Sequence, residues 1–99
     1  MMSEYHCYPL WEAMSDGLKN FEAYDLEIPE YLARRIEEWG DAFENTYQSD
    51  DPASSGFRTE ESKEEFIKQG SILLQELRIV LNDAFDLEYR TLNGEKIKL

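Results

Sequence analysis

The chain has 99 residues, enough for one hydrophobic core and too few for two. Its 41% hydrophobic content, with 13% aromatic residues, is too high for a disordered chain, although 32% of the residues are charged. Twenty-two acidic and ten basic residues give a net charge of −12, which disfavours binding to nucleic acid or to anionic membranes and favours basic partners.

The N-terminal part predicts a short strand and a turn. Residues 5–11 are rich in residues that favour β-structure, and Pro9 should end this strand or place it at a sheet edge. Asp16 and Gly17 predict a turn. Residues 18–27 remain ambiguous, because Leu18, Phe21 and Tyr24 recur at helical spacing but no capping residue precedes them.

A first helix is predicted over residues 29–48, with Pro29 as its first residue. Apolar side chains recur there at steps of four and three: Leu32, Ile36, Trp39, Phe43 and Tyr47. On the same helical wheel Glu37, Asp41 and Glu44 fall almost opposite this stripe. The helix should therefore have an aromatic inner face and an acidic outer face.

A loop is predicted over residues 48–58, followed by a long second helix. Thr59 is a good N-cap, and Glu60 and Glu61 suit the positive end of the helix dipole in the first turn. Apolar periodicity carries this helix to about Ala84, with a bend possible at Gly70.

Residues 87–99 predict a hairpin, because apolar and charged residues alternate around a two-residue turn at Asn93 and Gly94. The element order predicts a single α+β domain over residues 1–99. We expect two antiparallel helices packed on a small antiparallel sheet, which is formed by the N-terminal strand plus the C-terminal hairpin.

The sequence offers little for catalysis or for metal binding. His6 and Cys7 are the only residues of their types, and on a strand they would point to opposite faces, which opposes a nucleophilic pair. Asp50 and Asp51 lack the spacing of a calcium loop. We expect no enzyme activity, no metal and no cofactor. A single cysteine, no apolar segment of membrane-spanning length and no signal-peptide pattern predict a cytoplasmic protein.

A charged surface remains as the candidate site. Residues 37–65 contain ten acidic and two basic residues, so most of the charge excess lies there. Acidic residues interleaved with aromatic ones suit an interface with a basic protein. The predicted partner-binding residues are Glu37, Asp41, Glu44, Tyr47, Asp50, Asp51, Phe57, Glu60, Glu61 and Glu64. The alternative is a solvated acidic face that aids solubility, with Tyr47 and Phe57 folded into the core.

Four segments resemble a pattern shared by many short acidic bacterial proteins: residues 7–11 (CYPLW), 26–29 (LEIP), 37–39 (EEW) and 50–57 (DDPASSGF). The resemblance covers residues 5–85. Proteins of this type are similar to the immunity proteins of bacterial polymorphic toxin systems, including contact-dependent growth inhibition.

The resemblance implies that the protein neutralises the C-terminal domain of a toxin, commonly an RNase or DNase with a basic substrate groove. The first hypothesis is therefore an immunity protein that covers a basic nuclease surface with its acidic face. The alternative is an acidic interaction module or regulator that binds a basic host protein and has no link to a toxin.

Overall fold

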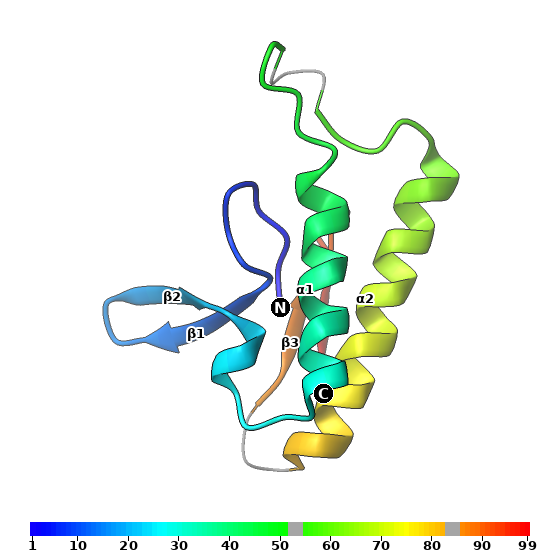
Figure 1. Cartoon of the computed structure of the whole chain (residues 1–99). Helices are drawn as coiled ribbons and strands as arrows, with labels where there is room; N and C mark the ends of the chain where they lie inside the picture. Colours follow the sequence, from blue (N-terminus) through cyan, green and yellow to red (C-terminus); the bar gives the residue numbers. More distant parts are fainter. Residues whose placement is uncertain (52–54, 83–85) are drawn as a thin grey trace.

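The computed structural model describes residues 1–51, 55–82 and 86–99. The elements in chain order are β1 (Leu10–Met14), β2 (Gly17–Phe21), η1 (Ala23–Asp25), α1 (Glu30–Glu44), α2 (Glu60–Leu81), β3 (Glu88–Arg90) and β4 (Lys96–Lys98). The helices α1 and α2 lie side by side and run antiparallel, and the strands form small antiparallel sheets beside them (Figure 1). The predicted α+β class is confirmed.

The strands form two separate two-stranded sheets, β1–β2 and β3–β4, rather than the single sheet that we predicted. The predicted N-terminal strand at residues 5–11 is wrong in position, because β1 begins only at Leu10 and pairs with β2. The preceding residues cannot extend it. His6 has a φ of +63°, the N–H of Cys7 donates to the carbonyl of Glu4 at 3.3 Å, and Pro9 has no N–H to donate.

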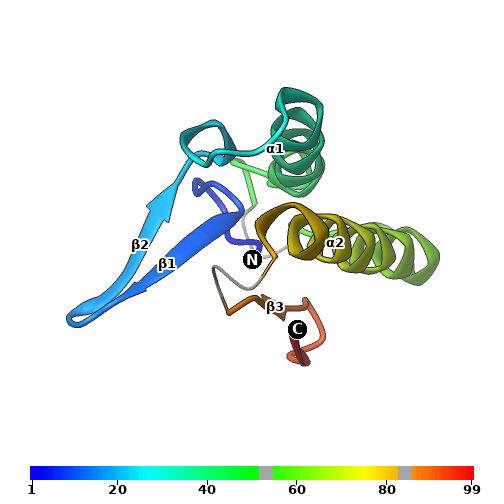
Figure 2. The same cartoon turned by 90° about the horizontal axis from the view of Figure 1, so that it is seen from below.

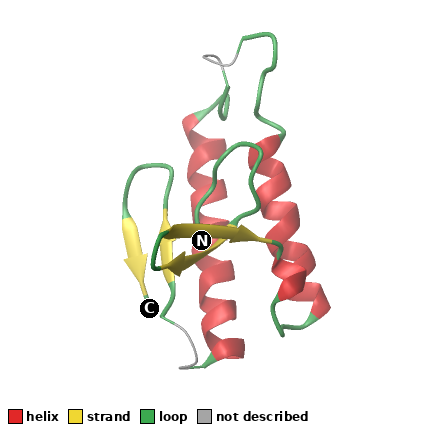
Figure 3. Ribbon diagram, turned by 90° about the vertical axis from the view of Figure 1, so that its left-hand side faces the viewer, coloured by secondary structure: helices red, strands yellow, loops and turns green. Residues whose placement is uncertain are grey.

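Met1 and Met2 connect the two sheets. Met2 forms a parallel bridge with Arg90, and its N–H donates to the carbonyl of Pro9 at 2.9 Å. The amino group of Met1 donates to the carbonyl of Glu88 at 2.6 Å, and burial lowers the pKa of this amino group to about 6. The chain's first two residues therefore hold the end of β1 next to β3, while the two sheets point in different directions (Figure 3).

The first helix, α1, ends at Glu44, four residues earlier than predicted. Its buried residues belong to the predicted stripe or adjoin it: Leu32, Ala33, Ile36 and Trp39. Pro29 is its N-cap rather than its first residue. After Glu44 the N–H groups of Thr46 and Tyr47 donate to carbonyls three residues back, which is the tighter geometry of a helix end.

The second helix begins as predicted. Thr59 is its N-cap, and the hydroxyl oxygen of Thr59 accepts the N–H of Ser62 at 3.0 Å. The helix is unbroken through Gly70 and ends at Leu81, and Asn82 follows with a φ of +53°. Ala84, where we predicted the end, lies outside the described residues.

The C-terminal hairpin is confirmed, but its turn is longer than predicted. The N–H of Thr91 donates to the carbonyl of Glu95 at 2.9 Å, so this pair encloses three residues instead of two. The N–H of Gly94 donates to Thr91 at 3.0 Å, and Gly94 has a φ of +83°. A three-residue loop that ends in a left-handed glycine is the next most common hairpin connection.

Aromatic side chains join both helices and β3 in the core. The rings of Trp39 and Phe66 stack at 4.4 Å with an interplanar angle of 3°, and the indole N–H of Trp39 donates to the carbonyl of Phe66 at 2.9 Å. Tyr89 from β3 meets the edge of Trp39 at 5.7 Å, and burial raises the pKa of Tyr89. Gly70 leaves room for both rings.

Within the described part of the chain, each helix is too short or too polar to span a bilayer.

Replacement of Gly70 by Ala is expected to lower the free energy of unfolding by about 1–3 kcal/mol, because overpacking forces buried groups to move. The added carbon would lie 2.5 Å from the hydroxyl oxygen of Tyr89 and 2.7 Å from the indole ring of Trp39. Urea denaturation measures the change. Gln75→Ala, an exposed change on the same helix, should stay within about 0.5 kcal/mol of the wild type. A wild-type midpoint for Gly70→Ala would contradict this close packing.

Candidate partner-binding surface

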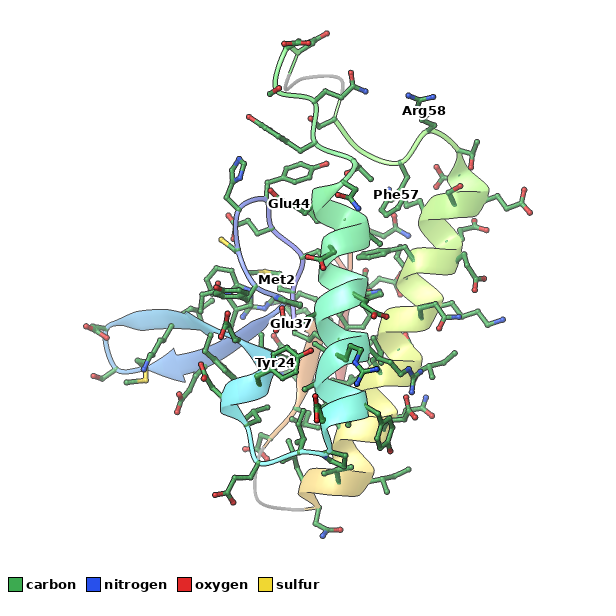
Figure 4. All side chains as sticks on the ribbon, viewed as in Figure 1. Met2, Tyr24, Glu37, Glu44, Phe57 and Arg58 are labelled. Carbon is green, nitrogen blue, oxygen red and sulfur yellow. The ribbon has the colours of Figure 1, made fainter. Side chains whose placement is uncertain are left out.

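The three acidic residues of α1 in the predicted interface do not lie on a bare outer face. One carboxylate oxygen of Glu37 accepts the N–H of Ala23 at 2.5 Å. One oxygen of Glu44 accepts the backbone N–H of His6 at 2.8 Å, and the other lies 3.0 Å from its Nδ1. Asp41 is exposed. The prediction of an acidic outer face is therefore wrong for Glu37 and Glu44, which preceding parts of the chain contact, and is confirmed for Asp41 (Figure 4).

The N-terminal segment, residues 5–9, packs against α1 and the residues that follow it, and contacts aromatic side chains as well as Glu44. The ring of Tyr5 stacks on Phe43 at 4.3 Å, with an interplanar angle of 8°. Tyr47 lies 5.1 Å from the ring of Tyr5 and 4.8 Å from the ring of His6. A carbon added at Gly40 would lie only 2.7 Å from the ring of Pro9. Tyr47 is therefore half-buried by this segment rather than presented from the end of a helix.

Phe57 packs on the core. Its ring centroid lies 4.9 Å from that of Phe66 and 6.4 Å from that of Phe43, and the residue is half-buried. Its position agrees with the alternative given above, in which this aromatic residue packs inward.

The other predicted residues are exposed: Asp50, Asp51, Glu60, Glu61 and Glu64. Two hydrogen bonds join the beginning and the end of the loop between α1 and α2. The N–H of Gly56 donates to the carbonyl of Thr46 at 3.2 Å, and the N–H of Gln48 donates to the hydroxyl of Ser55 at 2.8 Å. The segments that carry these five residues, the loop after α1 and the first turns of α2, lie at one end of the molecule (Figure 1). We call this set the acidic end.

A second group of carboxylates gathers where η1 meets α1. Burial raises the pKa of Glu37, the N–H of Ala23 opposes this effect, and the negative charges of Glu22, Asp41 and Asp25 raise the pKa further. We call Glu22, Asp25, Glu37 and Asp41 the η1 cluster. Their mutual repulsion would be relieved by a positive charge placed among them.

Exposed tyrosines accompany the η1 cluster. A hydrogen bond to Glu22 raises the pKa of the Tyr8 hydroxyl, and Tyr8 is 45% exposed. Tyr24 is 52% exposed and lies beside Glu37 (Figure 4). Glu22, Asp25 and both tyrosines were not among the predicted site residues, because no local pattern of residues shows that residues 22–25 dock on α1.

His6 and Cys7 lie in a turn rather than on a strand, so the expected opposite orientation on a strand does not apply. Desolvation raises the pKa of the Cys7 thiol, and the charges of Glu4 and Glu44 raise it further. The thiolate form, which is the reactive one, is therefore disfavoured. Among the described residues no three His, Cys, Asp or Glu side chains are grouped so that they could hold a metal ion.

The family model described as Serratia CdiI immunity protein-like matches residues 1–92, which include both helices and β1 to β3. This match confirms the resemblance to the immunity proteins of contact-dependent growth inhibition. A comparison with curated protein sequences found no match.

Glu37→Gln is expected to be at least as stable as the wild type at pH 7, with a gain below about 1 kcal/mol because water still screens this carboxylate. The pKa of Glu37 is raised in the folded chain above its ordinary value of 4.5. The ionised carboxylate therefore lowers the free energy of unfolding at pH values above the raised pKa, and this destabilisation disappears as the pH falls towards 4.5. The advantage of Gln should therefore shrink on acidification.

Urea denaturation at pH 7 and at pH 4.5 measures this difference. Glu64→Gln, an exposed change on α2, is the matched control and should alter stability little at either pH. A Glu37→Gln variant that is less stable than the wild type at pH 7 would mean that the hydrogen bond from Ala23 outweighs desolvation.

Proposed function

Because the chain belongs to the Serratia CdiI immunity protein-like family, we propose that it neutralises a cognate toxin domain with a basic surface, and that this domain is a nuclease. The family match over residues 1–92 carries the immunity role. The nature of the toxin and the surface that binds it are our proposal, argued from charge.

Charge supports a basic, nucleic-acid-cleaving target. A nuclease needs a positive groove to hold phosphates, and a chain of net charge −12 is attracted to such a groove as a competitor. The acidic end supplies five exposed carboxylates, and the η1 cluster supplies like charges held close together. Residues 37–65, which include the acidic end, contain two bases against ten acids.

To inhibit the toxin, the chain needs only to cover the toxin's basic surface and requires no chemistry of its own. Acidic residues accelerate encounter and orient the partner, while apolar contacts hold the complex. The residues that we propose for the acidic contact are Asp41 on α1 together with the acidic end. Glu37 and Glu44 contribute charge at this face but are held by Ala23 and His6, and Tyr47 and Phe57 support the surface from beneath. We further propose that neutralisation takes place in the cytoplasm.

Co-expression tests the immunity role directly. The toxin domain encoded beside this gene is produced in a host cell with or without the full chain, and growth is followed. We expect the wild-type chain to restore growth. Growth arrest in spite of normal expression of the chain would contradict the proposed function.

Glu61→Lys is expected to weaken toxin binding about five- to tenfold while leaving the thermal midpoint unchanged, because Glu61 is exposed at the acidic end and makes no core contact. Calorimetric titration at low and moderate salt measures the affinity and its salt dependence. Glu95→Lys, which makes the same charge change in the β3–β4 loop, should leave the affinity nearly unchanged. Equal losses in both variants would indicate an effect of net charge rather than a contact at the acidic end.

A further inference from the structure

The β1–β2 hairpin projects away from both helices, as Figure 2 shows. Beneath it lies an open crevice of about 1340 Å³, with the C-terminal half of α2 and the β3–β4 hairpin on its other sides. None of the residues of the acidic end lines this crevice. It is therefore separate from the loop and helix start at which Glu61 lies.

One face of the hairpin gives the crevice an apolar wall. The strand register pairs Ala13 with Leu18 and Trp11 with Asn20, so Trp11, Ala13 and Leu18 share a face. The indole N–H of Trp11 donates to the carbonyl of Met2 at 3.1 Å, which fixes this ring at the inner end of the crevice. Leucine side chains of α2 and of the C-terminal hairpin complete the apolar lining: Leu74, Leu77, Leu81, Leu87 and Leu99.

The outer part of the hairpin is left without cover from the rest of the described chain. Leu10 is buried and Phe21 packs on the core, so the base of the hairpin is anchored. Further out, Leu18 is 47% exposed on the face that lines the crevice, whereas Met14, 49% exposed, lies on the other face of the hairpin. A two-stranded hairpin is marginally stable alone, and an apolar crevice wall that is exposed to water is typical of an interaction site. Such a hairpin gains stability when a partner covers it.

The charges of the crevice favour a positive occupant. Glu88 is balanced by Arg90 at 2.7 Å and by Lys98 at 4.0 Å, and the remaining lining cation, Lys19, lies directly across the strand pair from Glu12. Glu22, Asp25 and Asp86 also line the crevice, and the described residues offer none of these three an ion pair. An apolar segment that enters the crevice would therefore meet uncompensated negative charge at its rim, which a Lys or Arg on that segment would neutralise.

We propose that this crevice receives an apolar segment of the cognate toxin domain, with a Lys or Arg next to the inserted apolar side chains. The inference rests on the proposed immunity function and specifies which kind of toxin segment the chain binds. Insertion buries Leu18 and leaves the basic residue beside Glu22 and Asp25.

The experiment uses the full chain and the toxin domain encoded beside its gene. Leu18→Ser removes apolar area from the crevice wall, and Ala13→Arg fills the space next to it with a bulky charged side chain. Ile79→Ser is the matched control, because Ile79 is an apolar side chain 74% exposed on α2 that does not line the crevice. A thermal melt of each variant verifies that the chain is folded.

We expect Leu18→Ser and Ala13→Arg each to weaken toxin binding at least tenfold and to reduce growth protection, while Ile79→Ser binds as the wild type does. Asp25→Lys should weaken binding more than Glu95→Lys. Folded Leu18→Ser and Ala13→Arg chains with wild-type affinity would overturn the inference.

Two other outcomes separate this inference from the immunity role. If the wild type protects and only Glu61→Lys binds weakly, the crevice is not the contact site and the immunity role stands. If sedimentation shows a wild-type dimer that Leu18→Ser dissociates, with toxin affinity unchanged, the occupant is a second copy and the inference is overturned.

Discussion

The close approach of Trp39 to Gly70 sets the relative positions of the two helices and the C-terminal hairpin. The indole lies between the helices, stacks on Phe66 and finds its hydrogen-bond acceptor in the carbonyl of Phe66, so a large amphipathic side chain is buried without an unsatisfied N–H. Because Gly70 has no side chain, Tyr89 of β3 reaches the same point from the other side. One junction therefore fixes α1, α2 and the C-terminal hairpin relative to one another.

The N-terminal residues depend on that junction and in turn position both candidate surfaces. Met1 and Met2 form hydrogen bonds and a β-bridge with β3, and the carbonyl of Met2 accepts the indole N–H of Trp11. The position of β3 therefore determines where the β1–β2 hairpin begins to project from the rest of the protein. The next residues fold over α1, where Pro9 lies against Gly40 and His6 is held by Glu44. The same segment that covers the acidic face of α1 thus directs the hairpin outwards.

The sequence predicts the helices well because apolar periodicity and capping are local signals. Thr59 is an N-cap for reasons contained in four residues, and Ile36 and Trp39 are buried as their spacing indicates. The position of β1 and the surroundings of Glu37 could not be predicted in this way, because they depend on contacts between distant parts of the chain. Periodicity shows which helix face is apolar, but it does not show which polar residues another segment will cover. The contact between Glu37 and Ala23 joins residues fourteen apart and is visible only in the folded chain.

Charge alone gives this protein attraction without selectivity. A net charge of −12 acts over roughly a Debye length of 8 Å at physiological salt and draws in any basic protein, including many that are not toxins. Discrimination requires contacts that only one partner can complete, and an apolar crevice that leaves Leu18 half exposed in water is a surface of this kind. We therefore propose that the acidic end and the crevice serve different steps of binding: the carboxylates accelerate the encounter with a basic domain, and the shape of the crevice determines whether the complex persists. On this view, exchanging the hairpin between related chains changes which toxin is held, whereas altering the acidic end changes how fast any of them arrives.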